Sequence, residues 1–164
     1  MSRHLVPSFP LQTFLPKVLS NIHEYVIIKN IFKIISRELS HEPLYIAIGG
    51  AFGAVLRYLA GNAAVKYFNP QLPYGTFIIN ISGCFLMGLL MTLIVDKGLL
   101  PPVWRLFLCV GVLGGFTTFS SFGYEVYTLF AEGNLACALL YAALSCLLGV
   151  LAAAFGVLAV KILI

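Results

Sequence analysis

Charged residues are scarce in this chain: lysine, arginine, aspartate and glutamate make up 10% of its 164 residues, while hydrophobic residues make up 60%. The mean hydropathy is +0.99. About a quarter of the residues of a typical soluble domain are charged, so this composition excludes that class. The sequence therefore predicts an integral membrane protein.

Histidine is missing from the hydrophobic part of the chain, because His4, His23 and His41 all precede the first long apolar segment. The cysteines form no CxxC pair and are expected to be packing residues: Cys84, Cys109, Cys137 and Cys146. The remaining residues do not assemble a nucleophile, a base and an orienting group, so an enzyme is not expected.

A nucleic-acid surface is missing as well, since no basic stretch is interleaved with aromatic residues. The formal net charge of +4 comes largely from the first 41 residues and from the loop ends. Such a distribution favours contact with anionic lipid. We therefore expect a membrane surface as the partner of the basic residues.

Four long apolar segments lie between Leu44 and Ile164, separated by short connections. Each is long enough to cross a hydrocarbon core of about 30 Å as a helix. The expected spans are residues 44–65, 75–95, 103–130 and 135–162. The fold class is thus an all-α integral membrane protein, with residues 44–164 as a four-span domain and residues 1–43 as an N-terminal extension.

Within the extension, residues 22–39 have the pattern of a basic amphipathic helix. Apolar side chains share one face: Ile28, Ile31, Phe32, Ile35 and Leu39. Basic side chains lie on the other: Lys29, Lys33 and Arg37. We expect this helix to lie flat on an anionic leaflet, with a targeting segment as the alternative.

The third segment is too long and too irregular for one straight helix. About 28 residues would form a helix of about 42 Å, and the run from Gly114 to Phe122 reads GGFTTFSSF. Two glycines and two β-branched threonines weaken helix continuity, and hydroxyl groups can satisfy the backbone groups that a break frees. The sequence therefore predicts a broken third helix at mid-membrane and a candidate ion site there, since unwound carbonyls can coordinate ions.

Beyond the break, Phe119, Phe122 and Glu125 are spaced three apart and share a face of the resumed helix. One interpretation is that the phenylalanines face lipid or a neighbouring helix. The other is that this face lines an ion path, which the polar neighbours favour.

The other spans also carry polar residues, each open to two interpretations. Arg57 either extends toward the membrane surface or supplies a cation at a wet vestibule that concentrates anions. Asn80 either bonds to a neighbouring helix or lines a pore as a donor. Tyr141 and Ser145, four apart, offer a ladder of hydroxyl donors, unless Ser145 bonds to its own i−4 carbonyl.

Taken together, three ordered motifs resemble the Fluc (CrcB) family of fluoride channels. The first is GGAFGA from Gly49 with Arg57-Tyr58, the second is GTFIIN from Gly75 to Asn80 with Gly83, and the third is the GGFTTFSSF run with Glu125. The resemblance covers residues 44–164. It implies a homodimer of two antiparallel, dual-topology chains, or a heterodimer with a close paralogue, that forms two fluoride pores.

The resemblance also implies roles for individual residues. The pore phenylalanines correspond to Phe119 and Phe122, and the pore asparagine to Asn80. A polar track corresponds to Glu125, Tyr141 and Ser145. A structural Na⁺ is held in the family by backbone carbonyls that correspond to Gly114 and Thr117 of each chain.

The implied function is passive fluoride efflux across the plasma (inner) membrane, which lowers cytoplasmic fluoride. Fluoride is strongly hydrated, so a selective path must replace its water with closely spaced donors and with the positive edges of aromatic rings. A path without strong fixed cations also avoids trapping the anion. We expect no lysine or arginine near this central track.

Two other functions compete with this one. A small proton-coupled multidrug-type exporter is also a four-span antiparallel dimer, but it needs a carboxylate in the first span, and residues 44–65 contain none. A structural subunit without transport activity leaves the polar break unexplained.

With the extension included, the distribution of lysine and arginine favours both termini in the cytoplasm, and the bias is much weaker without it.

Overall fold

The computed structural model describes residues 24–31, 41–68 and 72–164. Contacts divide the chain into two units, residues 1–41 and residues 42–164. In the first unit, residues 24–31 are helical, with Ile28 and Ile31 exposed. They lie within the expected amphipathic helix, and its remaining basic residues, Lys33 and Arg37, lie outside the described residues.

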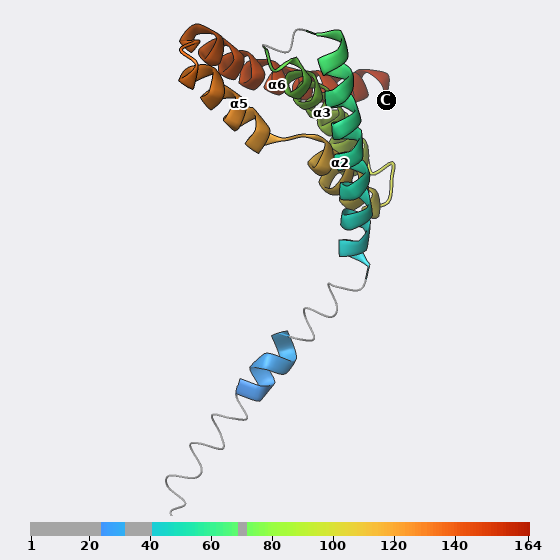
Figure 1. Cartoon of the computed structure of the whole chain (residues 1–164). Helices are drawn as coiled ribbons and strands as arrows, with labels where there is room; N and C mark the ends of the chain where they lie inside the picture. Colours follow the sequence, from blue (N-terminus) through green and yellow to red (C-terminus); the bar gives the residue numbers. More distant parts are fainter. Residues whose placement is uncertain (1–23, 32–40, 69–71) are drawn as a thin grey trace, which may run out of the picture. The chain divides into compact units, whose positions relative to one another are not determined.

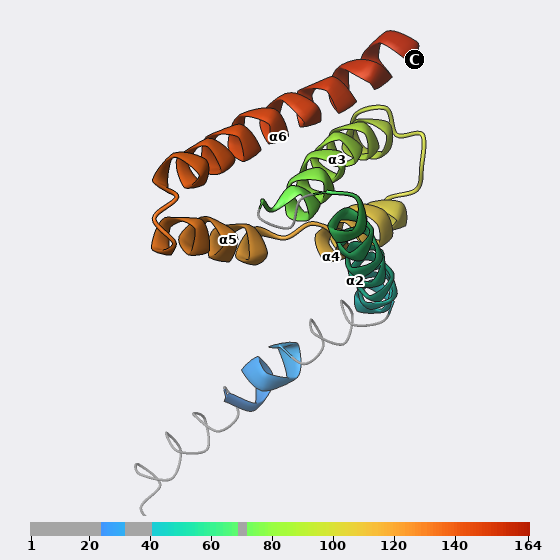
Figure 2. The ribbon, with the colours of Figure 1, turned by 45° about the horizontal axis from the view of Figure 1, so that its top comes forward.

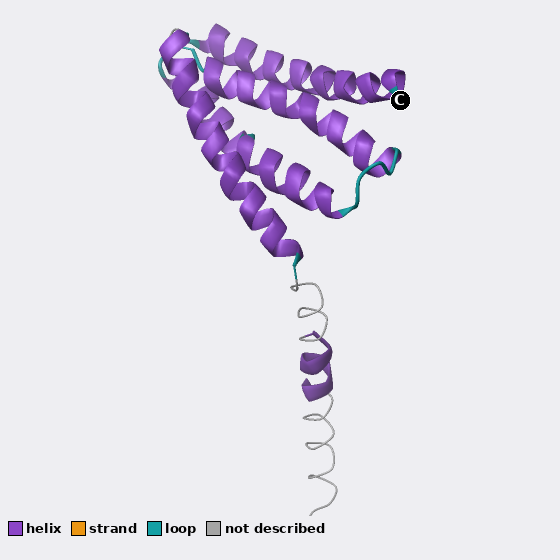
Figure 3. Ribbon diagram, turned by 90° about the vertical axis from the view of Figure 1, so that its right-hand side faces the viewer, coloured by secondary structure: helices purple, strands orange, loops and turns teal. Residues whose placement is uncertain are grey.

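The second unit is built from helices (Figures 1 and 3), and no strand occurs in the described parts of the chain. Within the described residues, four helical stretches are long and apolar enough to cross a membrane, which confirms the expected four spans. The first span is α2 (Glu42–Tyr67), and the second is α3 (Tyr74–Met91) with the π-helical segment η1 (Thr92–Asp96). The third span consists of the π-helical segment η2 (Arg105–Leu113), α4 (Gly114–Phe116) and α5 (Phe119–Ala131). The fourth span is α6 (Leu135–Leu163).

Close packing between α2 and the first half of the third span depends on glycine. A Cβ at Gly49 would overlap the Phe107 carbonyl oxygen, and a Cβ at Gly53 would overlap that of Val112. The two backbones are therefore in direct contact, as the small-residue face of the first span predicts. This contact anchors the segment that leads into the break.

A second close crossing joins α3 to α6, which run side by side in Figure 2. A Cβ at Gly88 would overlap the Ala153 carbonyl, and a Cβ at Gly156 would overlap that of Phe85. Glycines thus bring these two helices into backbone contact as well.

The third span is broken, as predicted, but the break lies later than the glycines. Gly114 and Gly115 remain helical, and the helix ends at Phe116. Thr117 (φ −80°, ψ 160°) and Thr118 (φ −150°, ψ 123°) are extended before α5 begins at Phe119. β-Branched residues suit an extended backbone better than a helix, so the two threonines form the break.

Helix α5 starts on a side-chain cap and ends at a glycine turn. The Thr118 hydroxyl accepts a hydrogen bond from the Ser121 N–H at 3.2 Å, which satisfies a donor at the helix N-terminus. Gly133, with φ +84°, turns the chain into α6, a conformation that costs glycine little. The α5–α6 hairpin that follows is visible in Figure 2.

Candidate functional site

Asn80 of α3 holds the extended backbone of Thr118 with two hydrogen bonds. Its amide nitrogen donates to the Thr118 carbonyl at 2.9 Å, and its amide oxygen accepts from the Thr118 N–H at 2.9 Å. In an uninterrupted helix that N–H would bond to the Gly114 carbonyl. Asn80 therefore replaces a helical hydrogen bond and fixes the break, and its amide retains a second N–H.

Arg57 of α2 is half-buried, and its guanidinium points at the break rather than at the membrane surface. Its Nη1 donates to the Thr117 carbonyl at 3.2 Å. The expectation of no lysine or arginine near the central track is therefore wrong. It failed because the close α2 crossing brings a residue about 60 positions away in sequence to the extended threonines.

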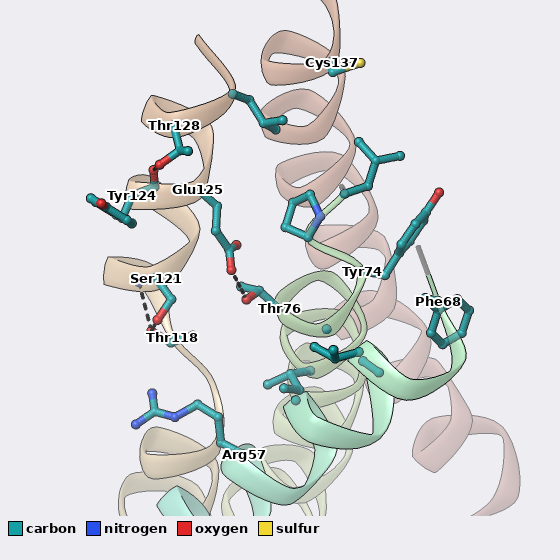
Figure 4. Close-up of a pocket in the computed structure, with 18 of the residues that line it drawn as sticks. Arg57, Phe68, Tyr74, Thr76, Thr118, Ser121, Tyr124, Glu125, Thr128 and Cys137 are labelled. Atoms are coloured by element: carbon teal, nitrogen blue, oxygen red, sulfur yellow. Dashed lines mark hydrogen bonds between the residues drawn. The ribbon is translucent and has the colours of Figure 1, made fainter. Parts of the chain in front are cut away.

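A cavity of about 1000 Å³ lies beside this junction (Figure 4). Arg57 lies at one end of it, and Thr76 and Glu125 lie farther along its wall. The cavity also extends past Thr118 and Ser121 of the break and the start of α5. A cation and several hydroxyl groups thus border one space within the membrane-spanning region.

Glu125 of α5 is linked to two other spans by hydroxyl donors. Thr76 Oγ1 of α3 donates to Glu125 Oε1 at 2.6 Å, and the Tyr141 hydroxyl of α6 donates to Glu125 Oε2 at 2.8 Å. The sequence pattern alone predicts no role for Thr76. Its position four residues before Asn80, on the same helical face, is the signal that could have identified it.

The aromatic residues continue the same row. The ring centroids of Phe119 and Phe122 are 5.7 Å apart, and those of Phe122 and Tyr141 are 5.3 Å apart in an edge-on arrangement. Phe122 packs against a small core that includes Leu129 and Tyr141, whereas Phe119 is 83% exposed. The predicted shared face of Phe119, Phe122 and Glu125 is therefore present, and it is open at the Phe119 end.

Ser145 lies one helical turn after Tyr141 on α6. Its Oγ is buried and has no hydrogen-bond partner among the described residues. It therefore does not bond to the i−4 carbonyl of its own helix, which was one of the two interpretations of the sequence. A buried hydroxyl without a partner is uncommon and calls for an explanation such as a water or an ion.

The two carbonyls implied for Na⁺ differ in their surroundings. The Thr118 N–H, which would donate to the Gly114 carbonyl in a continuous helix, donates to Asn80 instead. The Thr117 carbonyl accepts a hydrogen bond from Arg57. Carbonyl oxygens are the kind of ligand that hard cations bind, so the donor type fits. One chain offers two such oxygens, and Arg57 already shares one of them.

Comparison with known proteins places this chain in a family. Residues 44–157 match the model of the family described as CrcB-like protein, Camphor Resistance (CrcB). The chain is 43% identical over 120 residues to the fluoride-specific ion channel FluC of Sulfurihydrogenibium sp., covering 73% of this chain and 97% of that protein.

Two further relatives have the same name. Identity is 47% over 112 residues with the protein of Anaeromyxobacter dehalogenans, covering 68% of this chain and 88% of that one. It is 49% over 114 residues with the protein of Chloroflexus aurantiacus, covering 70% and 90%. The chain is therefore a multi-pass membrane protein that belongs to the CrcB-like family.

Proposed function

We propose that this protein is a fluoride-specific ion channel of the plasma membrane that lets fluoride leave the cytoplasm passively. The membership in the CrcB-like family and the name that its relatives share support this function. On this proposal the chain is a channel and not an enzyme, because it moves an ion without changing a covalent bond.

The single observation that carries the proposal is the row of aromatic edges and hydroxyl groups beside the helix break. Phe119 and Phe122 start the row, and Tyr141 joins them to the carboxylate of Glu125. Aromatic edges are electropositive and hydroxyl groups donate hydrogen bonds, so both can replace the water around a small anion. A purely apolar helix packing would need none of these polar groups.

Two donors of this row already serve a protein acceptor. Thr76 and Tyr141 both donate to Glu125. A fluoride ion in the row must either take these donors from the carboxylate or use donors that remain free. The second N–H of Asn80 and the hydroxyl of Ser145 are such donors. We therefore assign these residues to the fluoride path.

The working unit is proposed to be a dimer with a second, antiparallel copy of the chain, or with a close paralogue. The exposed aromatic side chains of α5 support this, since Phe119 is 83% exposed and Tyr124 is 71% exposed. An ion path open along one side needs a further wall. Gly114 and Thr117 carbonyls from two chains would also provide four oxygens for one structural Na⁺.

The test is ion efflux from proteoliposomes that contain the purified protein. Fluoride should leave rapidly down its gradient without a proton gradient, and chloride should not. Equal rates for the two anions would reject the proposed selectivity. Fluoride movement that needs a proton gradient would instead favour the coupled exporter.

A further inference from the structure

Arg57 makes an unusual contact for a cation inside a membrane span. Arg57 lies within α2. Among the described residues, its guanidinium donates a hydrogen bond to the Thr117 carbonyl oxygen. A charged side chain in a membrane span is expensive and normally pairs with another group. Here the partner is a backbone oxygen at the break rather than a carboxylate.

The break leaves its two extended residues dependent on side chains from other helices. Asn80 of α3 satisfies both backbone groups of Thr118, and Arg57 of α2 satisfies the carbonyl of Thr117. A hydrogen bond from a charged donor is stronger than one between neutral groups. Thr117 and Thr118 are thus held in place by side chains from two other helices, α2 and α3.

The same carbonyl oxygen is one of those proposed for the structural Na⁺. If Na⁺ binds this oxygen while the guanidinium remains bonded to it, the two positive charges lie within about 5 Å of each other and repel. A carbonyl oxygen has two lone pairs, so both contacts fit sterically. Electrostatic repulsion, rather than lack of space, therefore opposes joint occupancy.

We infer that Arg57 is a positioning residue of the break that competes with Na⁺ for the Thr117 carbonyl. It holds the extended backbone in place when no ion is bound, and it weakens Na⁺ binding because its positive charge lies beside the same oxygen and repels the ion. The competition rests on the Na⁺ site of the proposed function. The contact between Arg57 and the break does not.

The experiment measures thermal unfolding of the full-length purified protein as NaCl replaces N-methyl-D-glucamine chloride at constant ionic strength. Arg57→Gln should unfold at a lower temperature without Na⁺. It should also reach half of its maximal stabilisation at an about tenfold lower Na⁺ concentration, since the competing charge is gone. Arg57→Lys keeps the charge and should retain a Na⁺ midpoint close to that of the parent.

Arg105→Gln is the matched control, because Arg105 is an exposed arginine at the start of η2. It should leave both the Na⁺-free unfolding temperature and the Na⁺ midpoint unchanged. If Arg57→Gln does not fold, Arg57→His gives the comparison within one protein, since imidazole is charged at about pH 5.5 and neutral at about pH 8. Its Na⁺ midpoint should then fall as pH rises, while that of the parent stays constant.

A lower unfolding temperature with an unchanged Na⁺ midpoint would overturn the competition and leave Arg57 purely structural. An absence of Na⁺ stabilisation in every variant would overturn it as well. Fluoride efflux from the same preparations separates this inference from the proposed function. A Na⁺ midpoint that depends on Arg57 in a protein that passes no fluoride would support the inference and reject the channel.

Discussion

The two halves of the third span differ sharply in how they are packed. In η2, Cys109, Gly111 and Leu113 are buried against neighbouring helices, and the backbone contacts α2 through glycines. In α5, Leu129 is the buried residue, while Phe119 and Tyr124 are largely exposed. One half is an anchor, and the other presents aromatic and polar groups. Substitutions should therefore affect folding in the first half and permeation in the second.

The largest effect is expected at the anchor. In Gly53→Ala, the new Cβ would overlap the Val112 carbonyl and lie 2.9 Å from the Phe116 nitrogen. These are backbone atoms that cannot rotate away, so the variant should lose about 1–3 kcal/mol of stability or fail to fold. Thermal unfolding and size-exclusion chromatography measure this loss.

Gly61→Ala is the matched control on the same helix, because a Cβ there meets nothing within 4 Å. It should unfold like the parent. Equal behaviour of the two variants would show that the α2 contact does not anchor the third span.

The next largest effect is expected at the clamp between the two halves. Asn80→Ala leaves the N–H and the carbonyl of Thr118 without partners, and each buried unsatisfied group costs about 1–3 kcal/mol. We expect a protein that still inserts but whose fluoride efflux falls at least about tenfold, since about 1.4 kcal/mol is a factor of ten in rate.

Ser82→Ala on the same helix is the control, since Ser82 bonds only to carbonyls of its own helix, at 2.7 Å and 3.1 Å, among the described residues. Its efflux should match that of the parent. An Asn80→Ala protein with parental efflux would mean that the clamp does not hold the path.

A smaller change in stability and a clear change in efflux are expected for Phe122→Ile. The aliphatic side chain keeps most of the apolar contact with the small core around Leu129, so stability should fall by less than about 1.5 kcal/mol. The ring edge is lost, and efflux should drop about tenfold. Phe130→Ile, exposed on the same helix, should change neither quantity.

The smallest effect is expected for Tyr141→Phe. This change removes the donor to Glu125 Oε2 but keeps the ring beside Phe122. Loss of one hydrogen bond costs about 0.5–1.5 kcal/mol, so efflux should fall only a few-fold by the same conversion of energy into rate. Efflux assays on Tyr141→Phe and on Tyr127→Phe, an exposed α5 control, measure it. A complete loss of conduction in Tyr141→Phe would place the hydroxyl in the path more directly than the row suggests.

Much of the fold was predictable because hydropathy and length determine membrane spans. The four spans, the break in the third and the glycine face of the first are confirmed. The exact position of the break was harder to predict from the sequence. Gly114 and Gly115 are weak helix formers, so the sequence pattern places the break too early. Packing of η2 and α4 on α2 keeps them helical, and the diversion of the Thr118 N–H to Asn80 moves the break to the threonines.

The site was predictable to the extent that its residues share one helical face. The spacing of Phe119, Phe122 and Glu125 places them in one row, as the structure has it. Contacts between spans were not predictable in this way. The bonds of Thr76 to Glu125 and of Arg57 to Thr117 depend on helix crossings that no local pattern encodes.

The most direct test of the different roles of the two halves of the third span is a paired measurement on Phe119→Ile. Phe119 is 83% exposed and contributes little packing within the chain, yet it begins the proposed fluoride path. Thermal unfolding and fluoride efflux per mole of protein should be measured on the same preparation. We expect an unfolding temperature close to that of the parent and efflux lower by about tenfold or more. Parental efflux from a folded Phe119→Ile protein would contradict this prediction.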